Sequence, residues 1–137
     1  MIEMELSKIV IDEKRHDQLI ALKEKGGSRV LPIVIGLNEA SAIKLKISGF
    51  NPPRPLTHDL IFSIITGLEA GVEKIIIDKL EENTFFAKIV IKTADGSLKT
   101  IDARPSDSIA LAVRFHAPIL VEDEIVKQYE QFNQEKT

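Results

Sequence analysis

A five-residue segment occurs twice in this 137-residue chain with one conservative difference, Val10 against Ile76. Lys8-Ile9-Val10-Ile11-Asp12 recurs 66 residues later as Lys74-Ile75-Ile76-Ile77-Asp78. Both copies are rich in β-branched side chains, which favour strands. The repetition predicts two tandem units with the same order of elements, and this strongly limits the folds that the chain can adopt.

The same order of patterns follows each copy. A second β-like run, 19–22 or 85–88, leads to a tight turn. The turns contain Gly26-Gly27 and Asp95-Gly96, pairs that tolerate the positive φ of hairpin turns. A third β-like run and a helix-length segment come next, where the offset has grown to 68 residues. The added residues fall in a turn, where an insertion costs least.

A further amphipathic helix is expected after each unit. Residues 57–67 carry apolar side chains at helical spacing, with Thr57 as the expected N-cap. Residues 122–132 place three apolar side chains on one face: Ile125, Tyr129 and Phe132. Hairpins without β-α-β alternation favour an α+β fold. We expect a tandem duplication of a three-stranded antiparallel β unit plus helices, as a mostly antiparallel sheet or a partly closed barrel packed with helices. The alternative is a chance similarity of two amphipathic units.

The length and composition indicate one globular domain over residues 1–137, with internal repeats at about 1–69 and 70–133 and a flexible tail at 133–137. The absence of cysteine excludes disulfides, thiolate zinc sites and a cysteine nucleophile. The first residues include early acids and lack the basic-then-apolar pattern of a signal peptide. No apolar run approaches the ~20 residues that cross a bilayer. These features predict a cytoplasmic protein without membrane attachment.

The net charge of −3 argues against a protein whose main role is to coat nucleic acid. Such a role requires many lysines and arginines that neutralise phosphates. An enzyme that binds nucleic acid briefly remains compatible with this charge, because a carboxylate-rich metal site is itself acidic.

The densest group of polar residues lies where the third strand of the second unit leads into a helix. Asp102, Arg104, Ser106 and Asp107 lie within six residues, whereas the first unit has Gly36-Leu37-Asn38-Glu39 around the equivalent point. Sites are often placed on backbone that a core holds still. The asymmetry indicates that the second junction is the functional one.

Each of these residues has a functional and a structural interpretation. Asp102 and Asp107 are close enough in sequence to bind one Mg²⁺ or Mn²⁺; alternatively, Asp107 favours the helix N-terminus and Asp102 pairs with Arg104. Arg104 suits a phosphate, or it clamps a neighbouring loop. Ser106 is expected to be an N-cap rather than a nucleophile.

A second polar group follows the proline-rich stretch 51–57, where His58 and Asp59 are expected to open a helix. A histidine in a first helical turn can act as a general base or a metal ligand. The adjacency of the two residues is also common by chance. The functional interpretation gains strength if this segment folds against the junction at Asp102–Asp107.

Three blocks of this sequence together resemble the bifunctional nuclease domain family: residues 54–60 (Arg-Pro-Leu-Thr-His-Asp-Leu), 84–87 (Thr-Phe-Phe-Ala) and 102–112 (Asp-Ala-Arg-Pro-Ser-Asp-Ser-Ile-Ala-Leu-Ala). The resemblance runs from about residue 1 to 126. It implies an α+β oligomeric protein, and RNase and DNase activity is attributed to plant members. The polar motif positions of the family are occupied here by six residues: His58, Asp59, Asp102, Arg104, Ser106 and Asp107.

Together these observations predict a metal-assisted nuclease that cleaves RNA and DNA with little sequence preference. Asp102 and Asp107, with Asp59, would hold the cation that activates water. Arg104 would neutralise developing charge and His58 would transfer a proton. Arg54 and Ser106 are expected to contact the substrate. Nucleic-acid binding should be weak and transient.

Two other functions fit the same residues. The first is a non-enzymatic regulatory module that binds an anion or a partner protein through the polar motif. In the second, the motif stabilises an oligomer interface. A homo-oligomer is expected in any case, with a dimer favoured, because the sheets leave strand edges that a second copy can cover.

Overall fold

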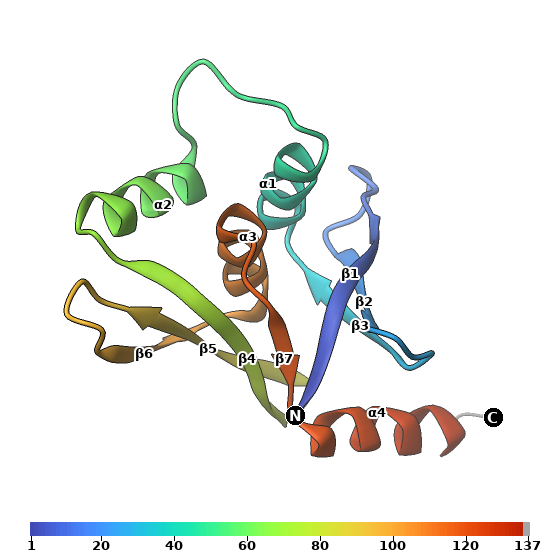
Figure 1. Ribbon diagram of the computed structural model, residues 1–137. Helices are drawn as coiled ribbons and strands as arrows, with labels where there is room; N and C mark the ends of the chain where they lie inside the picture. The colour runs from blue at the N-terminus through green and yellow to red at the C-terminus, as the bar shows by residue number, and fades with distance from the viewer. Residues whose placement is uncertain (136–137) are drawn as a thin grey trace.

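The computed structural model describes the backbone of residues 1–135 and the side chains of residues 1–131. The first unit contains β1 (Ile2–Val10), β2 (Gln18–Glu24), β3 (Val30–Ile35), α1 (Leu37–Ile47) and α2 (Thr57–Gly67). The second contains β4 (Gly71–Glu81), β5 (Thr84–Lys92), β6 (Leu98–Ala103), α3 (Pro105–Phe115), β7 (Ile119–Val121) and α4 (Asp123–Glu135). Figure 1 shows the arrangement.

The expected duplication is confirmed for the three strands and the first helix of each unit, which occur in the same order. β2 begins at residue 18 and β5 at residue 84, an offset of 66, whereas α1 begins at 37 and α3 at 105, an offset of 68. The ladder of each first hairpin shifts register at matching points, after Leu6 and after Val72. Gly96 adopts φ +85° in the Asp-Gly turn, as that turn requires. The added residues therefore lie in the second hairpin turn, as the sequence predicts.

Seven strands form one sheet in the order β3-β2-β1-β7-β4-β5-β6. β7 joins the two units, because it pairs antiparallel with β1 and parallel with β4. The first unit has Asn51-Pro52-Pro53 at the point that corresponds to β7 by the 68-residue offset. Proline cannot donate to a central ladder, so only the second unit supplies a strand to the middle of the sheet. The mostly antiparallel α+β fold is confirmed.

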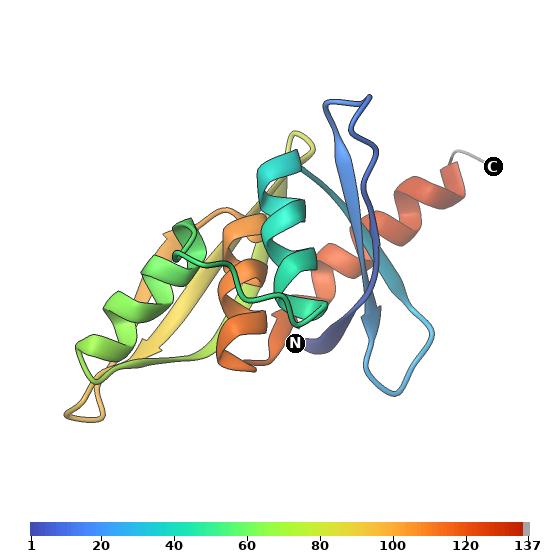
Figure 2. The ribbon, with the colours of Figure 1, turned by 90° about the horizontal axis from the view of Figure 1, so that it is seen from above.

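The sheet curls into an open half-barrel around α1 and α3 (Figure 1). Viewed from above, α1 and α3 lie side by side in the curl, whereas α2 lies toward the β6 end (Figure 2). α3 is the central element, since Ile109, Ala110, Leu111 and Ala112 are all buried. It packs on α1, α2, β4 and β5, so the core holds its N-terminus in place.

α4 lies outside the curl beside the N-terminus (Figure 1). Ile125 is buried and Tyr129 packs against the core, as their shared face predicts. Phe132 lies outside the residues whose side chains are described. The helix extends to Glu135, into the segment expected to be a flexible tail, and residues 136–137 lie outside the described residues. Within residues 1–135, the helices are too short or too polar to traverse a bilayer.

Two expected N-caps are wrong by one or two positions. Leu56, not Thr57, is the N-cap of α2, and its backbone N–H donates to the carboxylate of Asp59 at 3.1 Å. Arg104, not Ser106, is the N-cap of α3, because Pro105 occupies the first helical position, where its missing N–H costs nothing. Both helices begin earlier than a search for a hydroxyl side chain suggests.

Candidate functional site

The start of α3 is fixed by contacts on both sides of the β6–α3 junction. Pro105 restricts the backbone at the first helical position. Ser108 is completely buried, and its hydroxyl donates to the carbonyl of Arg104 at 3.0 Å. The junction therefore presents Arg104 and Asp107 from rigid backbone, as a site requires.

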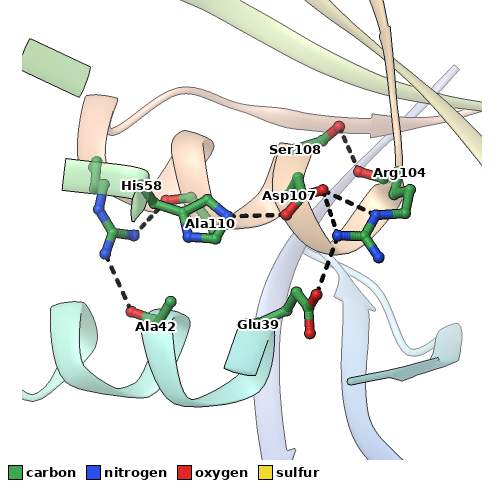
Figure 3. Close-up of polar contacts among 8 residues, drawn as sticks. Glu39, Ala42, His58, Arg104, Asp107, Ser108 and Ala110 are labelled. Atoms are coloured by element: carbon green, nitrogen blue, oxygen red, sulfur yellow. Dashed lines mark hydrogen bonds and ion pairs between the residues drawn. The ribbon is translucent and has the colours of Figure 1, made fainter. Parts of the chain in front are cut away.

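His58 lies on α2 and reaches across to this junction. Its Nε2 lies 2.9 Å from Oδ1 of Asp107 (Figure 3). Because a carboxylate only accepts hydrogen bonds, neutral His58 carries its proton on Nε2 and a lone pair on Nδ1. Within residues 1–131, Nδ1 of His58 has no hydrogen-bond partner in the protein. It is not fully buried either, because Oδ1 of Asp78 is the one side-chain atom in that part of the chain that is both buried and unpaired. Nδ1 therefore keeps some contact with solvent. The segment that contains His58 therefore folds against the β6–α3 junction, a contact that the sequence alone could not show.

Arg104 binds the other oxygen of the same carboxylate. Its Nε donates to Oδ2 of Asp107 at 3.0 Å, and its Nη2 donates to Oε1 of Glu39 at 3.1 Å (Figure 3). The hydrogen bond with Asp107, then its charge and that of Glu39, raise the pKa of Arg104 further above its ordinary value. The guanidinium is thus a permanent cation that remains largely exposed.

Glu39 is a site residue that the sequence reasoning missed. It occupies the third helical position of α1, and Asp107 occupies the third helical position of α3. The two units therefore place equivalent acids on one arginine. The internal repeat could have identified Glu39, because it lies 68 residues before Asp107, which is the offset between α1 and α3.

A second ion pair lies behind His58. Nε of Arg114 donates to Oδ1 of Asp59 at 2.9 Å, and Arg114 is buried. Burial raises the pKa of the Asp59 carboxyl, but the hydrogen bonds from the Leu56 backbone and from Arg114 outweigh it, so the pKa lies below its ordinary value. Asp59 is therefore a structural anion that positions α2. Arg114 was not identified from the sequence, because it lies seven residues beyond Asp107, the last polar residue of the motif.

A cleft of about 590 Å³ opens beside the His58–Asp107 pair. Its walls are aliphatic side chains from α2, β5, β6 and α3, namely Ile61, Ile65, Ile89, Ile91, Ile101, Ala103 and Leu111. Its polar end consists of Asn38, Glu39, Thr57, His58, Arg104 and Asp107. Clefts of this size with apolar walls and a few convergent polar groups are typical of ligand sites.

Asp102 is placed away from this cleft. Ile101 and Ala103 line the cleft, so Asp102 between them points to the opposite face of the sheet. There its carboxylate lies 3.3 Å from Nζ of Lys88, and it does not pair with Arg104. Asp102 and Asp107 are therefore not brought together. Among the described residues, no group of three or more His, Asp or Glu side chains is arranged to hold a metal ion. The residues present do not fit a shared divalent cation.

Ser106 and Arg54 also lie outside the cleft. Ser106 is buried and lines a separate cavity of about 490 Å³, which shares Arg104 with the cleft. Arg54 is exposed in the loop before α2, and no ion pair links it to any residue within 1–131. The site thus consists of His58, Asp107, Arg104 and Glu39, with Asp59 and Arg114 behind it.

The sequence model of the bifunctional nuclease domain matches residues 19–134, which include every element of the site. This chain belongs to the bifunctional nuclease domain family. An uncharacterized protein of Mycobacterium tuberculosis is 41% identical over 126 residues, which cover 92% of this chain and 74% of the relative. Two rice proteins are more distant. Bifunctional nuclease 1 of Oryza sativa subsp. japonica and the bifunctional nuclease of Oryza minuta are each 22% identical over 112 residues.

The matched part of the bifunctional nuclease domain is shorter than the plant proteins that contain it. The alignment covers 80% of this chain but 34% of each rice protein. Family membership indicates a nuclease-related function for the domain.

Proposed function

We propose that this protein is a nuclease that hydrolyses phosphodiester bonds in RNA and DNA with little sequence preference. The contact between Nε2 of His58 and the carboxylate of Asp107 at 2.9 Å carries the proposal. It forms a histidine–carboxylate pair at the polar end of a cleft, with a permanent cation on the same carboxylate. Membership of the bifunctional nuclease domain family supports the class of reaction.

His58 would act as the general base through Nδ1. This atom holds the lone pair that can take a proton from an attacking water, while Asp107 orients the ring and stabilises the imidazolium that forms. The proton would return to the leaving oxygen from the same nitrogen. The order of the groups is the one that acid–base catalysis requires: an accessible nitrogen, a ring, and a fixed carboxylate behind it.

Arg104 would neutralise the charge that develops on the phosphate. Its exposed guanidinium lies beside the N-terminus of α3, whose first backbone N–H groups have no helical partner. Contacts to phosphate carry no sequence information, so cleavage without sequence preference follows. Because the chain carries a net charge of −3, binding should be weak and should fall steeply with added salt.

Mg²⁺ or Mn²⁺ has no assigned role in this mechanism. Asp102 of β6 points away from the cleft that Asp107 of α3 lines, so the two carboxylates do not hold one cation between them. A dependence of cleavage on added divalent ions would instead reflect ions that arrive with the phosphates of the substrate.

One observation favours a second function, a non-enzymatic module that binds a ligand or a partner protein. Arg104 is already paired with both Glu39 and Asp107, so an incoming phosphate must compete with two carboxylates. This arrangement also suits a polar cluster that only ties α1 to α3. In that case the aliphatic cleft, and not the histidine, would carry the function.

The test is cleavage of single-stranded RNA and DNA by purified protein, with Mg²⁺, Mn²⁺ or EDTA. The proposal predicts that His58→Gln and Asp107→Asn each lower the rate by about 10²-fold or more, since a general base contributes roughly 10²- to 10⁴-fold. Asp95→Asn is the matched control, because Asp95 is an exposed carboxylate in the β5–β6 turn, remote from the cleft.

The Asp102→Asn variant separates the two kinds of site. If Asp102 and Asp107 share a cation, both asparagine variants lose activity together. If His58 and Asp107 act as an acid–base pair, Asp102→Asn retains activity. Equal cleavage by the wild type and by His58→Gln would refute the proposed role of His58, and absence of cleavage by every protein would favour the binding module.

A further inference from the structure

A second space borders Arg104, apart from the cleft. This Ser106 cavity has a volume of about 490 Å³, and it is bounded by β3, by the turn between β4 and β5, and by the first turn of α3. Arg104 lines both the cavity and the cleft. A ligand group that binds Arg104 from the cleft therefore has the Ser106 cavity directly beside it. The volume lies in the range of ligand sites.

The hydroxyl of Ser106 is unused by the protein. Ser106 lines the cavity and is only 6% exposed. Within residues 1–131 its hydroxyl makes no hydrogen bond, unlike the hydroxyl of Ser108, which donates to the carbonyl of Arg104. The one side-chain atom there that is both buried and unpaired is Oδ1 of Asp78, so the Ser106 hydroxyl opens into the cavity. Buried polar groups normally have a partner, and this one therefore indicates a ligand.

Phe85 supplies an aromatic ring to the same cavity. It is half-buried on β5 and shares its face of the sheet with Ala87, because alternate residues of a strand point the same way. Phe86 points to the opposite face, where Nζ of Lys79 lies 5.3 Å from the centroid of its ring. Among the described residues, no phenylalanine or tyrosine lines the cleft. The cavity thus has the platform on which nucleobases stack, and the cleft does not.

The charges of the Ser106 cavity favour a neutral ligand group over an anion. Among the described residues, its lining contains one carboxylate, Asp17, and one cation, Arg104. Arg104 is already paired with Glu39 and Asp107, so a free phosphate would find little net positive charge in the cavity. The remaining polar groups are uncharged: the amide of Asn83 and the hydroxyls of Thr84 and Ser106.

The turn that carries Asn83 is tight and well defined. Glu82 and Asn83 have φ values of +48° and +63°, and a type I′ turn requires positive φ at both central residues. Glu81 pairs with Thr84 on either side of them. The amide of Asn83 is therefore held at the rim of the cavity by fixed backbone, so a ligand orders little of the chain when it binds.

We propose that the Ser106 cavity holds the base of a nucleotide whose phosphate is bound at Arg104. The base stacks on Phe85, and Ser106 and Asn83 hydrogen-bond to its edge. Hydroxyl and amide groups both donate and accept hydrogen bonds, so the cavity takes any of the bases and adds little sequence preference. This subsite rests on the proposed function, because a base reaches it only if the site accepts nucleic acid.

The test compares the binding of adenosine monophosphate and of ribose phosphate, both phosphorylated at the same hydroxyl, by NMR of the backbone amides. The two ligands share the sugar and the phosphate, so the ratio of their Kd values reports the base alone. The wild type should bind the nucleotide at least about fivefold more tightly. The amide signals of Asn83, Thr84 and Ser106 should shift more with the nucleotide. Phe85→Leu, which keeps an apolar side chain but removes the ring, should bind both ligands with similar Kd.

Phe86→Leu is the matched control. Phe86 is the next residue, is likewise half-buried, and lies on the opposite face of β5. This variant should retain the preference for the nucleotide, and circular dichroism should show that both variants are folded. Equal Kd values in the wild type would overturn the proposal. A preference that persists in Phe85→Leu, or that is lost in Phe86→Leu, would also overturn it.

The binding measurement needs no turnover, so it separates the subsite from the nuclease activity. A protein that prefers the nucleotide through Phe85 but cleaves neither RNA nor DNA keeps the base subsite and refutes the proposed reaction. A protein that cleaves nucleic acid but binds the two ligands equally keeps the reaction and refutes the subsite.

Discussion

The replacement Arg114→Met tests how the site is held in place. Arg114 lies on α3 with 4% of its side chain exposed. It donates from Nε to Asp59 at 2.9 Å, from Nη1 to the carbonyl of Ala110 at 2.8 Å, and from Nη2 to the carbonyl of Ala42 at 3.4 Å. One guanidinium therefore links three helices (Figure 3 shows Ala42 and Ala110). Methionine keeps much of the volume but removes the charge and all three donors.

The expected loss follows from what the replacement leaves behind. Removal of one partner from a buried ion pair costs about 3–5 kcal/mol, because the other charge stays buried. The side chain of Asp59 is 28% exposed, so water reaches the stranded carboxylate and reduces the loss. We expect the free energy of unfolding to fall by about 3 kcal/mol. For a domain of this size that is a fall in Tm of roughly 10 °C.

Urea unfolding followed by far-ultraviolet circular dichroism measures this loss, since the chain contains no tryptophan for fluorescence. Arg54→Met is the matched control, because Arg54 is exposed in the loop before α2. It should change the free energy of unfolding by less than about 0.5 kcal/mol. A similarly small change in Arg114→Met would refute the inference that Arg114 anchors α2. The double variant Arg114→Met/Asp59→Leu should recover part of the loss, since no charge is then left unpaired.

Three further predictions address acid stability, the β5–β6 turn and substrate binding. The folded pKa of Asp59 is lowered, so the stability from this carboxylate is present above its unfolded pKa of ~3.9 and is lost as the pH falls through the folded value. The free energy of unfolding of Asp59→Asn, measured at low pH, should therefore fall less with decreasing pH than that of the wild type. Gly96→Ala should lower the free energy of unfolding by about 1–2 kcal/mol in urea, because φ is +85° at this residue, unlike in a Gly67→Ala control at negative φ. If the chain is a nuclease, Glu39→Gln should lower KM for RNA about two- to fivefold. The replacement frees Arg104 from a partly exposed ion pair worth about 0.5–1 kcal/mol. An unchanged KM would mean that Glu39 does not compete with phosphate.

The sequence predicted the elements of each unit well, because local patterns decide them. The β-branched repeat and the Asp95-Gly96 pair mark strands and a hairpin that the structure contains. The offset between units placed α3 relative to α1 correctly. The errors at the helix starts are also local. A hydroxyl side chain suggested Thr57 and Ser106 as N-caps, but Pro105 and the carboxylate of Asp59 fixed the first turns instead.

The composition of the site depended on contacts that no local pattern contains. His58 and Asp107 were both identified, yet 49 residues separate them and only the fold shows that they touch. Asp102 was grouped with Asp107 because the two are close in sequence. The alternation of side chains along β6 sends Asp102 to the other face of the sheet, where it meets Lys88. Closeness in sequence therefore did not predict closeness in space for Asp102 at the end of β6 and Asp107 at the start of α3.

The two units have diverged in complementary ways, and the site needs both changes. The second unit has β7 where the first has Asn51-Pro52-Pro53. The second unit therefore adds a strand to the sheet at this point, whereas the chain of the first unit forms a loop there. That loop carries α2 to the β6 end of the sheet, where it packs on α3, whereas α4, its counterpart by sequence offset, lies outside the curl (Figure 1). His58 can reach Asp107 only because α2 takes this route. A duplicated scaffold with a single elaborated junction would therefore have Asp107 and Arg104 but no histidine opposite them.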